Sequence, residues 1–259
     1  MRINNEVYDA MAEHWWAEDG CGTMRTILYF VNNVRFAYFL SILKNEAHFE
    51  YSGECLIDIG CGGGYLSEEF AKLGMKVTGV DPSKESLKVA EKHADDNKLN
   101  IEYVHGYGEN LPFASQSFPF AVCCDVFEHV NDVNAVVCEI SRILTPGGIV
   151  FFDTINRTII SKISLKISQD FASTSFIEPN VHVWEKFIKP NELAKIFEAN
   201  CLKTIEIKGM SPRVNMFSAY RNLRRYKKKE ISVKELAGVL DVQISNNIQN
   251  AYIGYAVKL

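Results

Sequence analysis

Three side chains that can exchange protons lie close together near the middle of the chain: Asp125, Glu128 and His129. A histidine can act as a general base near neutral pH, because its unperturbed pKa is about 6.5. The three residues directly follow residues 120–124, FAVCC, an apolar run with the composition of a buried strand. We therefore expect them to lie at the mouth of a binding site, and they are the candidate catalytic residues.

A glycine-rich turn, LIDIGCGGG at residues 56–64, is the second feature with chemical potential. Such a turn between a strand and a helix lets the backbone approach a ligand closely and directs free N–H groups at it. The glycines alternate at Gly60, Gly62 and Gly64. A dinucleotide-binding fold has GxGxxG, which would place a glycine where Tyr65 stands. The spacing therefore departs from the dinucleotide pattern.

Two carboxylates flank this turn. Asp58 precedes Gly60 and would repel a pyrophosphate but attract an ammonium or a sulfonium. Asp81 ends the second expected strand, where a carboxylate can accept hydrogen bonds from both hydroxyls of a ribose. A cationic adenosine compound without phosphates fits both carboxylates, and S-adenosylmethionine is such a compound. The alternative is a tight turn without a ligand, with Asp81 as a helix N-cap.

Strands alternate with helices around these residues. The expected strands cover residues 55–59, 76–80, 101–104, 120–124, 149–154, 202–208 and 251–258, the last antiparallel at the sheet edge. The expected helices include residues 4–17, 26–43, 65–73, 83–93, 133–144 and 191–199, and one that begins near residue 157. This order predicts a Rossmann-like α/β fold, with a mostly parallel seven-stranded sheet covered by helices on both faces. Ligands of such sheets bind at the carboxyl ends of the strands.

Composition is that of an ordinary globular enzyme, with 47% apolar and 23% charged residues. The formal net charge of −4 gives no overall attraction to nucleic acid. Basic residues cluster at 221–229, as a solvated helix face or as a binding patch. The seven cysteines include no CxxC pair, and the sequence shows neither a secretory signal nor a long uncharged apolar span. We therefore expect a cytoplasmic protein that binds no nucleic acid.

Several segments resemble the class I S-adenosylmethionine-dependent methyltransferases, and most closely the O-methyltransferases of ubiquinone biosynthesis. The segments are HWW at 14–16, NNVRFAYF at 32–39, LIDIGCGGG at 56–64, GVDPS at 79–83, CDVFEHV at 124–130, LTPGG at 144–148, FFDTINRT at 151–158 and HVWEKFIKPNEL at 182–193. The glycine motif is common to all class I enzymes. The WW, DTINRT and WEKFIKPNEL segments are particular to the ubiquinone group, and the resemblance ends near Gly209.

The resemblance implies S-adenosylmethionine as the cofactor and assigns residues to it. Arg35 would reach the methionine carboxylate from an N-terminal helix, and the stretch VHGYGENLPF at 104–113 resembles an adenine-binding segment. With the two carboxylates and glycines discussed above, the expected cofactor-binding residues are Arg35, Asp58, Gly60, Gly62, Asp81, Glu109 and Cys124. Cys124 stands where the family often has Met, and Tyr107 where it often has Asp.

The ubiquinone enzymes have an acid, an acid and a histidine linked to a divalent cation at the positions of Asp125, Glu128 and His129. The motif here is DxxEH, where that family typically has ExxEH. A hard cation such as Mg²⁺ would favour the two carboxylates and lower the pKa of a catechol hydroxyl. Metal-free methyltransferases also carry an EH pair at this place. Both a Mg²⁺ site and a metal-free site with His129 as the base are therefore open.

The resemblance implies O-methylation of a phenolic or catechol-type small molecule similar to a demethylated quinone precursor. The alternatives are a natural-product methyltransferase that modifies N, C or O of a soluble acceptor, and a binding module without catalysis. The segment 211–250 resembles the ubiquinone enzymes poorly, which weakens any transfer of substrate identity. The oligomeric state is not indicated by the sequence.

We expect one domain of 1–259, with a helical cap at 1–50, a cofactor-binding core at 51–156, an insertion at 157–188 and a C-terminal part at 189–259. The insertion would be a lid or a peripheral membrane contact. Its expected helix has an apolar face at Ile160, Ile163, Ile167 and Phe171, with lysines between them. Such a helix can lie on anionic lipid. The alternative is an amphipathic helix that packs on the core.

Overall fold

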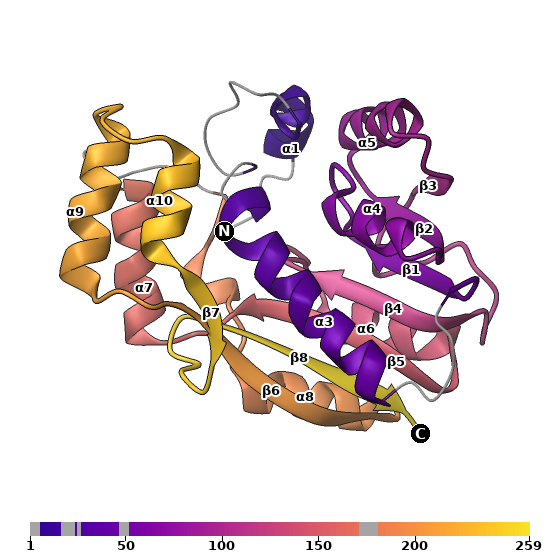
Figure 1. Ribbon diagram of the computed structural model, residues 1–259. Helices are drawn as coiled ribbons and strands as arrows, with labels where there is room; N and C mark the ends of the chain where they lie inside the picture. Colours follow the sequence, from indigo (N-terminus) through magenta and orange to yellow (C-terminus); the bar gives the residue numbers. More distant parts are fainter. Residues whose placement is uncertain (1–5, 17–23, 25–26, 47–51, 171–180) are drawn as a thin grey trace.

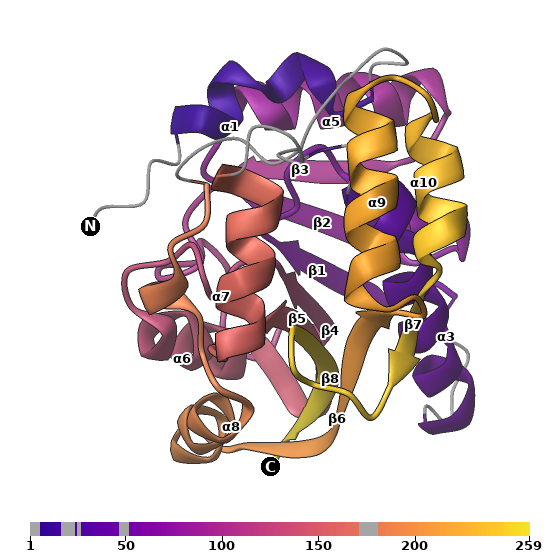
Figure 2. The same cartoon turned by 90° about the vertical axis from the view of Figure 1, so that its left-hand side faces the viewer.

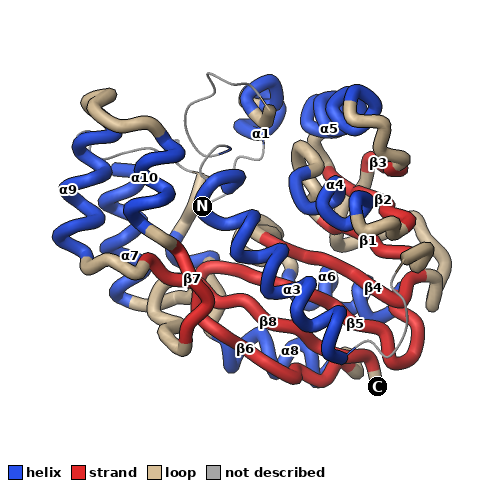
Figure 3. Tube along the Cα trace, in the orientation of Figure 1, coloured by secondary structure: helices blue, strands red, loops and turns tan. Residues whose placement is uncertain are grey.

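The computed structural model describes residues 6–16, 24, 27–46, 52–170 and 181–259. Within these residues, eight strands form one sheet in the order β3-β2-β1-β4-β5-β8-β6-β7 (Figure 3). The strands are β1 (Cys55–Ile59), β2 (Lys76–Asp81), β3 (Ile101–His105), β4 (Phe118–Cys124), β5 (Leu144–Ile155), β6 (Leu202–Pro212), β7 (Val242–Ser245) and β8 (Ala251–Lys258). The expected α/β fold is confirmed, with the short strand β7 in addition.

Strands β1 to β5 pair in parallel, and β8 runs antiparallel between β5 and β6. The prediction of an antiparallel β8 is confirmed, but its placement at the sheet edge is wrong. Tyr252 and Ile253 point to opposite faces of the sheet, and both are fully buried. A strand that buries apolar side chains on both faces belongs in the interior of a sheet.

The helices cover both faces of the sheet (Figures 1 and 2). Alternate residues of β1 face opposite ways: Ile57 packs with α6 and α8, whereas Leu56 packs with α3 and α4. The α-helices are α1 (Glu6–Ala10), α3 (Asn33–Glu46), α4 (Tyr65–Lys72), α5 (Lys84–Asp96), α6 (Val133–Ile143), α7 (Ile159–Leu165), α8 (Pro190–Ala199), α9 (Met216–Lys227) and α10 (Val233–Leu240). The shorter turns are η1 (Ala12–His14), η2 (Ile27–Asn32), η3 (Lys166–Asp170) and η4 (Trp184–Lys186).

Three expected helices differ in form. Within the described part of the helix expected at 4–17, the chain forms the short helix α1 and then the 3-10 turn η1. The helix expected at 26–43 is a π-helical turn, η2, followed by α3. The helix expected from residue 157 is α7 followed by the π-helical turn η3, and Phe171 lies outside the described residues. Thr158 begins α7, because its side chain accepts a hydrogen bond from the backbone N–H of Ser161 and forms a capping box with it.

Helices α9 and α10 lie side by side, and α7 stands apart from them, at the end of the molecule toward which the parallel strands point (Figures 1 and 2). Helices α9 and α10 make up half of the segment 211–250, which resembles the ubiquinone enzymes poorly. Leu223 of α9 and Leu236 of α10 are buried against Phe30 of η2, and Ile167 of η3 packs on the same cluster. The C-terminal extension is thus joined to the N-terminal segment. None of the described helices is long and apolar enough to cross a membrane.

Candidate active site

The glycine turn connects β1 to α4 through backbone conformations that favour glycine. Gly60 and Gly62 have φ angles of +73° and +52°. A Cβ atom on Gly62 would lie 2.5 Å from the ring of Trp15, and one on Gly60 would lie 2.4 Å from Val126. The turn is therefore enclosed by the N-terminal segment on one side and by the loop after β4 on the other.

The two carboxylates beside the turn are both buried and both held by hydrogen bonds. Asp81 accepts hydrogen bonds from the backbone N–H groups of Gly62 and Ser83, each at 2.8 Å. Ser83, and not Asp81, is the N-cap of α5. Asp58 accepts a hydrogen bond from the hydroxyl of Ser67 at 2.6 Å. Burial raises the pKa of each carboxyl to about 6.

A cavity of about 380 Å³ opens at the carboxyl ends of β1, β2 and β4. Its lining brings together nearly all of the residues that the sequence singled out: Arg35, Asp58, Gly60, Gly62, Asp81, Glu109, Cys124, Asp125 and His129. Glu128 is absent from the lining, and its side chain is 1% exposed. The cavity thus runs from the glycine turn to the candidate catalytic residues, as the strand order requires.

Arg35 lines the cavity and is held there by two carboxylates of the chain, and its contact with the methionine carboxylate stays a prediction. Its guanidinium, on α3, donates hydrogen bonds to both oxygens of Asp153 on β5 and, at 2.6 Å, to Asp125. Burial alone would lower the pKa of Arg35, but the charges of Asp125 and Asp153 raise it well above its usual value. The pKa of Asp125 shifts the other way: burial would raise it, but the charge and hydrogen bond of Arg35 lower it. In this arrangement Arg35 is a structural ion-pair partner within the cavity wall.

Comparison with known proteins identifies the family. A family model described as "Methyltransferase domain" matches residues 57–152. A ubiquinone biosynthesis O-methyltransferase of Pelagibacter ubique is 34% identical over 211 residues, which cover 80% of this chain and 86% of the relative. The chain belongs to the ubiquinone biosynthesis O-methyltransferase family. A similarly named enzyme of Coxiella burnetii is 32% identical over 83% of this chain and 89% of its own.

This methyltransferase also shares its fold with solved structures. A structure from Thermotoga maritima, described as an S-adenosylmethionine-dependent methyltransferase and possible histamine N-methyltransferase, has a TM-score of 0.60 and 18% identity. It covers 98% of this chain and 99% of its own. The enzyme class and the class I fold are therefore established, and the family uses S-adenosylmethionine as the methyl donor. At this identity the structural likeness carries the fold alone.

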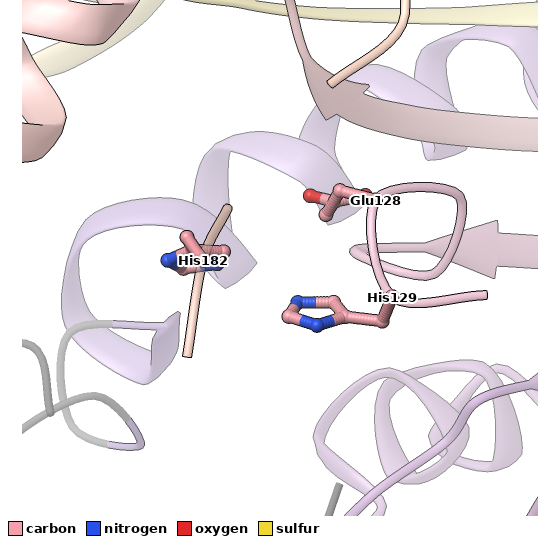
Figure 4. Close-up of side chains that lie close together, drawn as sticks. All are labelled: Glu128, His129 and His182. Carbon is pink, nitrogen blue, oxygen red and sulfur yellow. The ribbon is translucent and has the colours of Figure 1, made fainter. Parts of the chain in front are cut away.

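The three residues considered as possible magnesium ligands, Asp125, Glu128 and His129, do not form one cluster of ligand atoms in the described residues. Asp125 turns to Arg35, and the cluster of potential ligands in the described residues is Glu128, His129 and His182 instead (Figure 4). Burial and the charge of Asp125 raise the pKa of Glu128 to about 8, and burial with His182 lowers that of His129 to about 3. Burial lowers the pKa of His182 to about 4. The set is rich in nitrogen and does not fit Mg²⁺, which prefers oxygen ligands.

The sequence did not predict three residues of the site, Tyr8, Trp15 and His182. The hydroxyl of Tyr8 on α1 lies 3.3 Å from Nε2 of His129, and the indole N–H of Trp15 donates to Ser86 at 3.0 Å. His182 stands beside His129, with ring centroids 5.1 Å apart. Trp15 and His182 belong to the segments HWW and HVWEKFIKPNEL, which carry the family resemblance, but a segment match does not say which side chain turns inward. Nothing in the sequence marks Tyr8.

Proposed function

We propose that this methyltransferase transfers the methyl group of S-adenosylmethionine to an oxygen of a phenolic or catechol-type small molecule similar to a demethylated quinone precursor. The observation that carries the proposal is the continuous cavity that joins the glycine turn to Asp125 and His129. The names of the curated relatives, which are ubiquinone biosynthesis O-methyltransferases, support this acceptor class.

The cofactor would lie across the carboxyl ends of β1 and β2. Asp81 would accept hydrogen bonds from the ribose, because its two oxygens are fixed by backbone N–H groups and each retains a second lone pair. Asp58 would favour the positive charge of the sulfonium. Gly60, Gly62, Glu109 and Cys124 line the same part of the cavity and are proposed as its remaining contacts. Arg35 is proposed to act through Asp125 and Asp153, by fixing the wall next to the methionine end.

Methyl transfer is an in-line displacement, so the acceptor oxygen must be aligned with the methyl group and its proton must be removed. His129 lines the cavity, and its Nδ1 atom accepts no hydrogen bond. We propose that His129 receives the proton when no cation is bound nearby. Glu128 and Asp125 would position the loop: Glu128 accepts a hydrogen bond from Thr154 at 2.7 Å, and Asp125 pairs with Arg35.

A soluble natural product is the second candidate acceptor. The observation that favours it is the α9–α10 pair, which stands with α7 where the parallel strands point (Figure 2). The relatives match 78–83% of the chain, so part of it has no counterpart in these matches. If α9 and α10 form an additional wall at this end of the molecule, they would change which acceptor fits. In this alternative the methyl group is transferred to N, C or O of a soluble compound.

The proposed insertion at 157–188 would contact a membrane through α7. Three isoleucines of this helix, Ile159, Ile160 and Ile163, expose 74%, 37% and 40% of their surface, respectively. Lys162 and Lys166 are exposed on the same segment. Exposed apolar side chains interleaved with lysines suit the surface of an anionic bilayer, where a prenylated acceptor would be found.

The acceptor is tested with a labelled methyl donor. Purified protein is incubated with a panel that contains a catechol-type quinone precursor, simple phenols, amines and soluble polyphenols, and the products are identified by mass spectrometry. We expect O-methylation of the catechol and little transfer to the amines. Transfer to nitrogen or carbon alone, or to soluble polyphenols in preference to the quinone precursor, would favour the second candidate. His129→Ala should lower the rate of transfer, and Lys195→Ala, at an exposed position of α8, is its control.

A further inference from the structure

A buried carboxylate lies outside the cavity, on the helix that follows the glycine turn. The side chain of Glu68 on α4 is 1% exposed, and its Oε1 atom lies 2.5 Å from Nδ1 of His93 on α5. Its other oxygen lies 3.7 Å from Nζ of Lys72, whose side chain is 47% exposed. A carboxylate accepts hydrogen bonds and donates none, so Nδ1 of His93 is the donor. Because a buried carboxylate needs such a donor, the contact fixes the orientation of the imidazole.

The imidazole of His93 in turn holds an indole of the N-terminal segment. The rings of His93 and Trp16 are stacked, with centroids 3.6 Å apart and an angle of 4° between their planes. The indole N–H of Trp16 donates a hydrogen bond to the carbonyl oxygen of Gly63 at 2.7 Å. Trp16 therefore lies between α5 and the glycine turn and contacts both. Glu68, His93 and Trp16 together form a clamp across three separate parts of the chain.

Trp15, the residue before Trp16, lines the cavity beside the glycine turn. A Cβ atom on Gly62 or Gly63 would lie 2.5 or 2.4 Å from the ring of Trp15, so this ring lies directly against the turn. The backbone carbonyl of Trp15 accepts the hydroxyl hydrogen of Tyr65. The three clamp residues lie outside the cavity lining. They can therefore influence a ligand in the cavity only through Trp15 and the backbone of the turn.

We propose that His93 is a positioning residue for the cofactor. Stacked on Trp16 and hydrogen-bonded to Glu68, it holds Trp15 against the glycine turn and so shapes the wall beside which the cofactor would bind. A wall that is already in place before the ligand arrives reduces the cost of ordering on binding. This role rests on the proposed placement of the cofactor at the carboxyl ends of β1 and β2, and it is independent of the acceptor.

The affinity for S-adenosylhomocysteine, measured by isothermal titration without acceptor, tests this role. In His93→Gln the aromatic ring is lost while an amide N–H can still reach Glu68, whereas His93→Phe keeps a ring that can stack on Trp16. The energy of an aromatic pair corresponds to about a 2- to 10-fold change in a binding constant. We therefore expect His93→Gln to bind about 2- to 10-fold more weakly than the wild type, and His93→Phe to retain most of the affinity.

The variant Trp16→Leu tests whether His93 acts through the stack. Because both changes break the same contact, His93→Gln should add little to the loss of affinity that Trp16→Leu causes. Lys92→Ala removes an exposed ion pair on the same helix and is the matched control, which should bind like the wild type. Thermal unfolding shows whether each variant is folded. If His93→Gln does not fold, Trp16→Leu against Trp16→Phe provides the same comparison from the other side of the stack.

A clamp with a purely structural role would change the melting temperature and leave the cofactor affinity unaltered. Wild-type affinity in a folded His93→Gln would therefore overturn the proposal, as would equal losses in His93→Gln and His93→Phe or additive losses in the double variant. The variant Asp81→Ala separates this failure from that of the cofactor placement. If Asp81→Ala weakens binding and His93→Gln does not, the placement stands and the role of His93 fails; if neither weakens binding, both fail.

Discussion

Arg35 of α3 and Asp153 of β5 form an ion pair that is almost completely buried, with 3% and 0% of the two side chains exposed. The guanidinium donates to one carboxylate oxygen through Nε and to the other through Nη2, the latter at 3.0 Å. A bidentate pair of this kind fixes both partners in orientation as well as in distance. It fastens α3 to the end of the strand that borders the candidate active site.

Removal of one partner of this pair should destabilise the fold. In Asp153→Ala, Arg35 remains buried with Asp125 as its sole carboxylate partner among the described residues. We expect the free energy of unfolding to fall by about 1–3 kcal/mol, since the buried guanidinium loses the acceptors of two hydrogen bonds while Asp125 still balances its charge. Urea denaturation measures it. Glu85→Ala breaks an exposed ion pair with Lys88 and should cost less than about 1 kcal/mol; equal losses in the two variants would contradict this reasoning.

Asp81 should dominate the affinity for the cofactor. Loss of a charged hydrogen-bond acceptor costs about 1.5–3 kcal/mol, so Asp81→Ala should weaken S-adenosylhomocysteine binding by about 10- to 100-fold. Isothermal titration measures the change. Because Asp81 also accepts hydrogen bonds from Gly62 and Ser83, Asp81→Asn provides a milder variant with one remaining acceptor. Asp95→Ala, at an exposed position on α5, is the control. Unaltered affinity in both Asp81 variants would reject the assignment of the pocket.

Cofactor binding should release protons near pH 6. Burial raises the pKa of Asp58 and of Asp81 to about 6, and a cationic ligand or a ribose favours the charged carboxylates. Affinity for S-adenosylmethionine should therefore rise with pH up to about 7 and then level off. Titrations at pH 6 in two buffers of different ionisation enthalpy should give different apparent enthalpies, and the difference should vanish at pH 8. Equal enthalpies at pH 6 would show that neither carboxyl is protonated in the free enzyme.

The same two carboxyls should make the free energy of unfolding fall as the pH rises, whereas the cofactor affinity rises. Their pKa values in the folded protein lie above the ordinary value of about 3.9, so the folded state binds protons more tightly than the unfolded chain. Their contribution to stability is therefore largest below pH 4, declines between about pH 4 and pH 6, and is constant above. Urea denaturation of Asp58→Asn should show a weaker decline over this window than that of the wild type. A steeper decline in the variant would contradict the assignment.

Gly62 should tolerate no side chain. Its φ of +52° costs an L-residue roughly 1–2 kcal/mol, and a Cβ atom would collide with Trp15. Gly62→Ala should therefore lower both stability and cofactor affinity, as measured by thermal unfolding and isothermal titration. Gly238→Ala is the matched control, because a Cβ atom there meets no other atom within 4 Å and lies in a helix. That variant should gain about 0.5–1 kcal/mol. A neutral Gly62→Ala would show that the turn is not enclosed by Trp15.

The isoleucines of α7 should govern any contact with lipid. Flotation with anionic vesicles measures the fraction of protein that is bound. The double variant Ile159→Glu and Ile163→Glu should lose this binding, because it places charges on the face that would enter the bilayer. Ile205→Glu changes a similarly exposed isoleucine on β6 and should float like the wild type. No flotation of the wild type, or loss in the β6 variant as well, would favour a lid without lipid contact.

Local sequence patterns determined the glycine turn, the acids beside it and the order of strands and helices. The spacing of Gly60, Gly62 and Gly64 and the carboxylates Asp58 and Asp81 predicted a turn at the end of β1 with two acids beside it, because strand ends, turns and helix starts are set by nearby residues. Parallel strands then place the residues that follow them at one edge of the sheet. For that reason Asp125 and His129 were expected beside the cofactor site, and they line the same cavity.

Tertiary structure alone decided which of these groups meet. Arg35, Asp125 and Asp153 come from three separate parts of the chain. Their packing gives Asp125 the guanidinium of Arg35 as its ion-pair partner. His182 reaches His129 from a distant segment of the sequence, and Tyr8 does so from the N-terminal helix. Such contacts depend on how layers of the fold pack and on which buried charges must be neutralised, and neither is encoded in local spacing.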